Sequence, residues 1–348
     1  MRMSEILRGG FGKETPSEKK LLFTAEKTPL EPAPKKEVPP PSEAPPKVAA
    51  ESLYHDLLKF VEELLTKAKE GRAIDGREIQ QKVEPLLDRV MDPEEVLMYL
   101  ATTRSTPEYY LYAHAVNVAI LALRLGNALG YDRERLLTLG VGALLQDIGM
   151  VRVMDIAEKK EALTPEEWEE IRRHPQHSVD ILKAISNLPS VCLYIAENAH
   201  ERRNGSGYPQ GLSGRQLSEE AQVVAIVDVY EALTHSRSYR NKLLPYEALK
   251  EILKNKELFD PRILKTFVQH ITVYPVGCWV ELSTDEVGRV FRVTPTLPLR
   301  PSVKLFFDSQ MRPLHPEKEL DLAQHSTLYV KRVLDEKELE EKKERGFG

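Results

Sequence analysis

Apolar residues follow two different spacings along this chain. Between residues 107 and 270 three runs are apolar almost all round, and they read YLYAHAVNVAILALRL, RLLTLGVGALLQDIG and AQVVAIVDVYEAL. Helices with that pattern are buried on every side. The third run is rich in Val and Ile, so a buried strand is the rival interpretation. Its length and the capping residue Ser218, followed by two acids, favour a helix. Thr164 starts a capping box with Pro at the first helical position. The pattern predicts a mainly α fold with an all-helical core.

The segment before the core divides into two parts. In residues 51–106, apolar positions recur at helical spacing from Leu57 to Leu65, and Asp92-Pro93 has the form of a helix start. We interpret this part as a helical extension packed on the core. Residues 1–50 hold eight prolines between Thr28 and Ala50, with many Lys and Glu. Such a composition predicts a disordered tail, either a spacer or a segment that docks a protein partner, and we favour the spacer.

After residue 270 the pattern changes to short β-rich runs separated by turn residues. These runs read VGCWVELS, VGRVFRV, SVKLFFD and TLYVKRV. They predict a small antiparallel β domain over residues 271–334. Residues 335–348 form a charged tail that we expect to be frayed or disordered.

Composition and charge narrow the classes of function. The chain has 348 residues and a net charge of −5, which argues against a binder of polymeric nucleic acid. No apolar run approaches the ~18 residues of a membrane span, and no signal-peptide core is visible. The two cysteines are far apart, which argues against a disulfide framework or a zinc knuckle. We expect a cytoplasmic protein, and the sequence does not specify an oligomeric state.

Three of the apolar helices each carry a metal-capable side chain: His114, Asp147 and Asp228. A buried carboxylate without a partner is costly, so each of these groups requires one. Separate core hydrogen bonds would satisfy that requirement, and a shared cation would also satisfy it. His174 at a helix start and His200 at a helix end are placed to add nitrogen ligands to the same site.

Specific motifs connect these residues. Residues 145–149 read LQDIG, residues 198–209 read NAHERRNGSGYP, and residues 227–234 read VDVYEALT, with arginines following at 237 and 240. In this order and spacing the motifs resemble the HD-GYP family, a branch of the HD phosphohydrolase superfamily. The resemblance covers residues 109–270 and extends into the β-rich part.

The resemblance implies a function and a set of site residues. Members of the family are helical in this core, hold two or three metals, often iron or manganese, and hydrolyse cyclic di-GMP. By resemblance up to two divalent metals are expected here, with Asp147 as the catalytic bridge between them. His114 and Asp228 would complete one metal site, and His174 and His200 the other. The resemblance assigns substrate contacts to Tyr208, Arg237 and Arg240. It also implies cyclic di-GMP or a related dinucleotide as ligand.

The chain departs from the family at five site positions: Tyr110, Gln146, Met150, Ala199 and Asn204. Gln146 and Ala199 each stand where the family has a metal-binding histidine, and Met150 stands where it has a lysine. These departures favour a signalling protein with impaired or lost hydrolysis and reduced or absent metal, acting as a dinucleotide-binding or interaction module. A protein partner would then bind the N-terminal tail or the Gly-Tyr-Pro loop. The alternative is an active cyclic di-GMP phosphodiesterase with an atypical ligand set.

Overall fold

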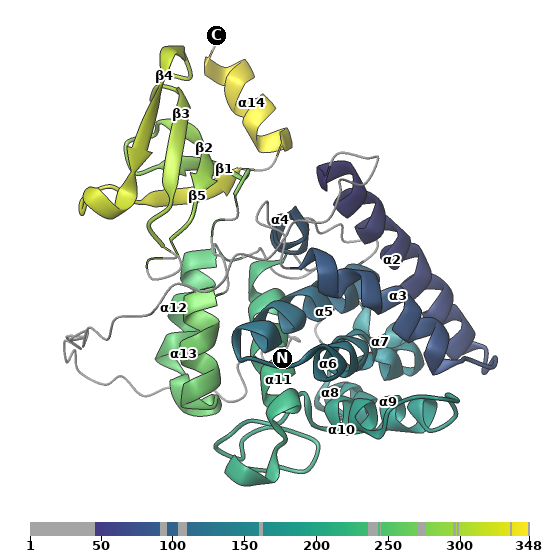
Figure 1. Ribbon diagram of the computed structural model, residues 1–348. Coiled ribbons are helices and arrows are strands. Elements are labelled where there is room, and N and C mark those ends of the chain that lie inside the picture. The colour runs from purple at the N-terminus through teal and green to yellow at the C-terminus, as the bar shows by residue number, and fades with distance from the viewer. Residues whose placement is uncertain are drawn as a thin grey trace.

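The computed structural model describes residues 46–90, 96–103, 110–159, 163–235, 243, 245–270, 274, 276–294, 297, 299–334 and 336–346. Within these residues the chain forms a helical part and a smaller β part, which lies at the upper left of Figure 1. One cluster of buried apolar side chains runs through both, from Tyr54 in the first helix to Phe267 in the last core helix and Val280 in the sheet. The predicted mainly α fold with a C-terminal antiparallel β domain is confirmed.

The helical part is built from long helices and short 3₁₀ turns. Its elements in chain order are α2 (Pro46–Lys69), α3 (Gly76–Arg89), α4 (Val96–Thr103), α5 (Tyr110–Ala128), α6 (Arg133–Leu145), η2 (Ile148–Arg152), α7 (Met154–Ala157), α8 (Pro165–Ile171), α9 (His174–Leu182), α10 (Ser190–Asn198), η3 (Gly214–Gln216), α11 (Glu219–Thr234), α12 (Pro245–Lys254), η4 (Lys256–Leu258) and α13 (Pro261–His270).

The three apolar runs form α5, α6 and α11, and they are buried along most of their length as their pattern predicts. The second run leaves the helix after Leu145, so the expectation that Asp147 lies on an apolar helix was wrong, and Asp147 lies in the break between α6 and η2. The run rich in Val and Ile is a helix. Ser218 caps it by accepting a hydrogen bond from Ala221 N. The capping residue therefore identified the helix start correctly from the sequence. The capping box at Thr164 is also present, with Glu167 as its second member.

The N-terminal extension packs along one side of the core, where α2 and α3 lie at the right of Figure 1. Tyr54 and Leu57 of α2 are fully buried against the core. Helix α2 begins at Pro46, so it starts within the segment expected to be a disordered tail. Proline suits the first turn of a helix because its missing N–H has no partner there. Residues 1–45 and the expected helix start at Asp92-Pro93 lie outside the described residues.

The β part is one five-stranded antiparallel sheet. Its strands are β1 (Trp279–Leu282), β2 (Val287–Arg292), β3 (Ser302–Phe307), β4 (Pro313–Asp321) and β5 (Val330–Leu334), in the order β4-β3-β2-β1-β5. Four strands correspond to the predicted runs, and β4 does not. It is largely exposed and polar, which is common for the edge strand of a sheet and removes the alternating pattern.

Residues 336–346 form helix α14 (Glu336–Gly346), which lies beside the sheet in Figure 1. The expectation of a frayed tail was therefore wrong for these residues. Leu339 packs into a small apolar cluster with Val287 and Leu334. Lys342 donates to the buried Glu281 of β1 at 2.8 Å. These tertiary contacts hold a helix whose own sequence is almost entirely charged.

Two simpler expectations concern the membrane and the cysteines. Among the described helices, none combines the length and the apolar character that crossing a bilayer requires. Cys192 and Cys278 are both buried, and no disulfide joins them.

Candidate metal centre

Five side chains meet in the middle of the helical part, and all of them are buried. They are His114 on α5, Asp147 between α6 and η2, His174 at the start of α9, His200 just after α10, and Asp228 on α11. These are the five residues for which the sequence predicts metal binding. No two of them come from the same helix, so the core packing brings them together.

The break after α6 directs Asp147 into the core. Gly149 in the following turn presses against α9, where a Cβ atom would lie 2.3 Å from His174 O and from Ser178 N. Ser178 of α9 stabilises the same contact, because its hydroxyl donates to Gln146 O at 2.8 Å and accepts from Gly149 N at 2.9 Å. The turn therefore needs glycine at this position. Its close approach to α9 sets the distance between Asp147 and His174.

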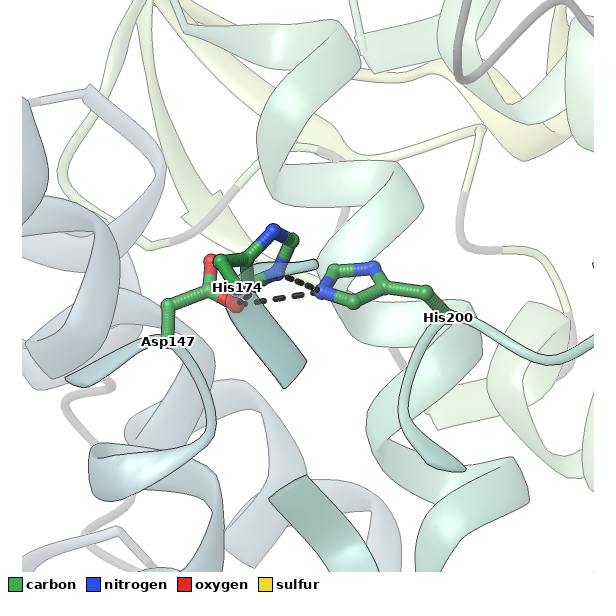
Figure 2. Close-up of side chains that lie close together, drawn as sticks. All are labelled: Asp147, His174 and His200. Carbon is green, nitrogen blue, oxygen red and sulfur yellow. Dashed lines mark hydrogen bonds and ion pairs between the residues drawn. The ribbon is translucent and has the colours of Figure 1, made fainter. Parts of the chain in front are cut away.

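We call Asp147, His174 and His200 the His174 group; Figure 2 shows its two rings converging on the carboxylate. His174 Nε2 lies 2.8 Å from His200 Nε2 and 3.2 Å from Asp147 Oδ1. His200 Nε2 lies 3.1 Å from the same oxygen. His174 Nδ1 donates to the backbone oxygen of Ile171 at 2.7 Å, because a carbonyl can only accept. In a neutral ring this leaves a lone pair on His174 Nε2, facing the other two ligand atoms.

We call His114, Asp147 and Asp228 the His114 group. His114 Nε2 lies 3.2 Å from Asp228 Oδ1 and 3.4 Å from Asp147 Oδ2. Its other nitrogen, Nδ1, lies 2.5 Å from Oε2 of the buried Glu231. A carboxylate can only accept, so Nδ1 carries the proton. Asp147 contributes one oxygen to each group and so joins the two.

The electrostatics of the centre call for positive charge. Burial alone would raise the pKa of Asp147, but its contacts with His114, His174 and His200 lower that pKa well below its usual value. Burial alone would lower the pKa of His114, yet Tyr110 and the surrounding carboxylates raise it to well above its usual value. Without metal, a proton on His114 supplies the charge that the carboxylates require.

Divalent cations fit the same arrangement. Two ligand atoms at ~2.1 Å from one ion and at right angles to each other lie about 3.0 Å apart. The distances within the two groups that involve a histidine nitrogen run from 2.8 Å to 3.4 Å. Imidazole nitrogens and carboxylate oxygens are ligands for iron, manganese and zinc. The residues present therefore fit two ions that share Asp147.

The glycine-rich loop forms one wall of the His174 group. The Tyr208 ring lies flat on the His200 ring, with centroids 5.1 Å apart. Glu201, fully buried, accepts backbone hydrogen bonds from Gln210 at 2.6 Å and from Gly211 and Leu212 at 3.0 Å. This carboxylate closes the loop and so holds Tyr208 in place.

Residues 95–263, which carry the whole centre, match the HD domain family. Residues 279–342 match the KOW domain associated with the HD domain, which corresponds to the sheet and most of α14. The chain belongs to the HD domain family. The match to the sheet extends the family relationship beyond the helical core.

Curated relatives of this HD domain protein include two named cyclic di-GMP phosphodiesterases. PA4108 of Pseudomonas aeruginosa is 32% identical over 73% of this chain and 62% of its own length. PdeB of Borreliella burgdorferi is 26% identical over 83% of this chain and 77% of its own length. The chain thus spans less than two thirds of the Pseudomonas protein. Among solved structures, Bd1817, a HDG"Y"P protein from Bdellovibrio bacteriovorus, matches 66% of this chain and 72% of its own with a TM-score of 0.53. Its 18% identity supports the HD fold alone.

Gln146 and Ala199, which the family resemblance predicts to stand in place of histidines, differ in what they leave at the HD centre. Gln146 lies beside the His114 group, with Nε2 3.4 Å from Asp228 Oδ1. Its Oε1 is buried, and no hydrogen-bond donor reaches it among the described residues. Ala199 is fully buried in the apolar core, and its methyl side chain offers no metal-binding atom to the His174 group. Met150 is buried as well.

The remaining site positions have different surroundings. The Tyr110 ring stacks on His114 with centroids 5.6 Å apart, and its hydroxyl lies 3.4 Å from His114 Nδ1. Asn204 is exposed and accepts from Ser206 N at 3.1 Å, so it stabilises the start of the loop. Arg237 and Arg240 lie outside the described residues, and their substrate contacts stay predictions.

The residues that support the ligands were not among those predicted from the sequence. Glu231 backs His114, and Asn117 donates to Glu231 Oε1 at 3.0 Å. A signal for both was available, because Glu231 lies three positions after Asp228 on α11, and Asn117 three positions after His114 on α5. Residues three apart share a helix face. A polar side chain that shares the face of a buried ligand is a candidate to support it.

Proposed function

We propose that this chain is an active, metal-dependent phosphodiesterase that hydrolyses cyclic di-GMP with an atypical ligand set. The observation that carries the proposal is the convergence of the two donor groups on Asp147. The proton positions forced by Ile171 O and Glu231 leave His174 Nε2 and His114 Nε2 facing carboxylate oxygens. A pair of divalent cations at such a centre supplies Lewis-acid chemistry for phosphodiester hydrolysis. The names of the two curated relatives support the same substrate.

Gln146 completes the ligand set in this proposal. Rotating its amide by half a turn exchanges Oε1 and Nε2, which would bring the unpartnered oxygen to the position that now meets Asp228. An amide oxygen is a weaker ligand than imidazole but still a ligand. The His114 group would then have four protein donors, with His114, Asp147, Asp228 and Gln146, whereas the His174 group has three.

Tyr208 is proposed to orient the substrate. Burial, together with the carboxylates of Asp147 and Asp228, raises the pKa of Tyr208 well above its usual value. The phenol therefore stays protonated at neutral pH and can donate a hydrogen bond to a phosphate oxygen or a base. Arg237 and Arg240 are proposed to bind phosphate, where the fork of a guanidinium suits two oxygens.

A second function, a dinucleotide-binding module without hydrolysis, is favoured by Ala199. Its buried methyl group leaves the His174 group with one ligand fewer than a histidine would provide. One experiment separates the two functions. The full chain is loaded with Mn²⁺ or Fe²⁺, its metal content is measured by mass spectrometry, and cyclic di-GMP is followed by chromatography.

Opening of the ring to a linear dinucleotide, at two metals per chain, is the expected result. Two metals with tight dinucleotide binding and no product would favour the binding module. A chain that takes up no metal would overturn the proposed metal centre itself.

A further inference from the structure

A line of buried polar groups crosses from the N-terminal extension to the metal centre. The Tyr54 hydroxyl of α2 lies 2.8 Å from Asn117 Oδ1 on α5. Asn117 Nδ2 lies 3.0 Å from Glu231 Oε1 on α11, and Glu231 Oε2 meets His114 Nδ1 at 2.5 Å. All four side chains are at most 2% exposed. The line joins three helices before it reaches the His114 group.

The direction of each hydrogen bond in this line is fixed by Glu231. A carboxylate can only accept, so the Asn117 amide nitrogen must face it and donate. The amide oxygen of Asn117 then faces Tyr54, so the tyrosine hydroxyl must be the donor. On the other side, His114 Nδ1 must donate to Glu231, which leaves His114 Nε2 as the atom directed at Asp147 and Asp228.

We propose that Tyr54 is a positioning residue of the metal centre, acting through Asn117 and Glu231 on His114. Its hydroxyl holds the oxygen end of the Asn117 amide in the orientation that Glu231 requires. That amide in turn holds the Glu231 carboxylate together with His235, whose Nδ1 lies 3.2 Å from Oε1. A carboxylate behind a metal-binding imidazole orients the ring and makes its free nitrogen a better ligand. The inference rests on the proposed metal-dependent function.

Through Tyr54, the helical extension takes part in positioning a ligand of the metal centre. Tyr54 lies outside the residues 95–263 that match the HD domain family, so the match does not account for this contact. The line reaches only one of the two groups. His174 has the neutral backbone carbonyl of Ile171 behind it, and no such line leads to it from α2 among the described residues. Loss of the Tyr54 hydroxyl should therefore alter metal binding at the His114 group and leave the His174 group unchanged.

The test compares two tyrosine-to-phenylalanine changes in the full-length chain. Tyr54→Phe removes the first hydroxyl of the line. Tyr131→Phe is the matched control, because that hydroxyl donates at 2.7 Å to Glu219 Oε1, and neither of these two residues belongs to the centre or the line. Glu231→Gln removes the charge behind His114 and keeps the size of the side chain. Binding of Mn²⁺ is measured by competition with a chelator, and thermal unfolding of the metal-free proteins is measured in parallel.

For Tyr54→Phe we expect one of the two Mn²⁺ equivalents to weaken by up to ~10-fold, and for Glu231→Gln by ~10–100-fold, with the other equivalent unchanged. Tyr131→Phe should lose similar thermal stability and bind Mn²⁺ like the wild type. If Tyr54→Phe binds both equivalents as Tyr131→Phe does, the positioning role is wrong and the proposed function stands. If the wild type itself binds no Mn²⁺, the proposed function fails first.

Discussion

The two halves of the metal centre share Asp147 but differ in charge and in support. The His114 group has a second carboxylate in Asp228 and a third, Glu231, behind its imidazole. The His174 group pairs two imidazoles. The ring of His174 has the neutral backbone carbonyl of Ile171 behind it, and His200 Nδ1 lies 3.6 Å from Asp228 Oδ2, a longer contact than that of His114 with Glu231. A carboxylate behind an imidazole strengthens it as a ligand. The His114 group is therefore expected to bind a divalent cation more tightly.

The two histidine replacements increase this difference. Gln146 keeps a buried oxygen beside the His114 group, whereas Ala199 contributes only a methyl group near the His174 group. The two positions are therefore unequal, and the loss of a ligand has to be judged with the groups that remain around it. This difference predicts stepwise metal binding, with the His174 group filled second.

The largest effect is expected from the residue that the two groups share. Asp147→Ala removes an oxygen from both groups, so both metals should be lost, with affinities down by more than the ~10–100-fold typical of a supporting residue. Hydrolysis of cyclic di-GMP should disappear with them. His177→Ala is the control, because His177 lies near the surface and contacts Glu170 at 3.7 Å. Metal analysis of both variants is the measurement, and one retained metal in Asp147→Ala would contradict the shared role.

A smaller effect is expected when each histidine is restored singly. Ala199→His adds a fourth donor to the weaker His174 group, and Gln146→His exchanges one donor for a better one in the His114 group. The second metal equivalent should therefore gain more affinity from Ala199→His than the first gains from Gln146→His. The buried position of residue 199 should cost the metal-free protein about 1–3 kcal/mol through overpacking. Metal titrations of both variants show which one gains more affinity. A larger gain from Gln146→His would show that the His174 group already binds its metal more tightly.

Much of the fold could be predicted because its signals are local. Ser218 and the length of the following run identify α11 as a helix, and burial follows from its apolar faces. Strand β4 could not be recognised, since an edge strand exposed on both faces loses the alternating pattern. Helix α14 could not be recognised either. Its order depends on contacts with the sheet, such as the pair Lys342–Glu281, that no local pattern contains.

The candidate site shows the same division between local and tertiary information. His114, Asp147 and Asp228 stand out because a polar side chain within an apolar run needs a partner. Which partner it has depends on packing. Asn117 and Glu231 share helix faces with predicted ligands, which makes them candidates, but their hydrogen bond to each other depends on the packing of α5 against α11. The sequence shows that Gln146 retains an amide oxygen and that Ala199 has no ligand atom in its side chain, but it does not contain the surroundings of either residue.

The glycine-rich loop offers a way to change the His174 group alone. Glu201→Ala leaves the backbone N–H groups of Gln210, Gly211 and Leu212 without their acceptor, which should lower the free energy of unfolding by about 2–4 kcal/mol. Tyr208 would then lose its fixed position over His200, so KM for cyclic di-GMP should rise. Urea unfolding and steady-state kinetics are the measurements.

Glu197→Ala is the matched control for the loop, because its carboxylate accepts only from the side chain of Gln210 at the surface, at 3.0 Å. Its effect on unfolding should stay within about 0.5 kcal/mol. Weakening of the His114-group metal in Glu201→Ala would show that the loop supports the whole centre and that the two halves are not independent.

The smallest effect concerns a buried carboxylate that needs no metal. Glu281 of β1 accepts hydrogen bonds from Lys342 at 2.8 Å, Lys331 at 2.9 Å and Arg332 at 3.0 Å. Burial alone would raise the pKa of Glu281, but these three cations lower it to about 2 from an ordinary 4.5. A lowered pKa means that the stabilisation is complete above pH 4.5 and is lost as the pH falls towards 2.

With allowance for solvent around the partly exposed cations, the stabilisation amounts to about 2 kcal/mol at pH 7. Glu281→Gln should therefore unfold at a lower urea concentration than the wild type at neutral pH. The difference between the two urea midpoints should become smaller as the pH falls below 4.5, because a protonated glutamic acid resembles glutamine. The same titration on Glu317→Gln, on the exposed edge strand, should show a much smaller gap at every pH. A gap for Glu281→Gln that stays constant down to the acid limit of folding would mean that lost packing, rather than charge, accounts for the difference. In that case the three cations would not be the source of the stability that Glu281 contributes.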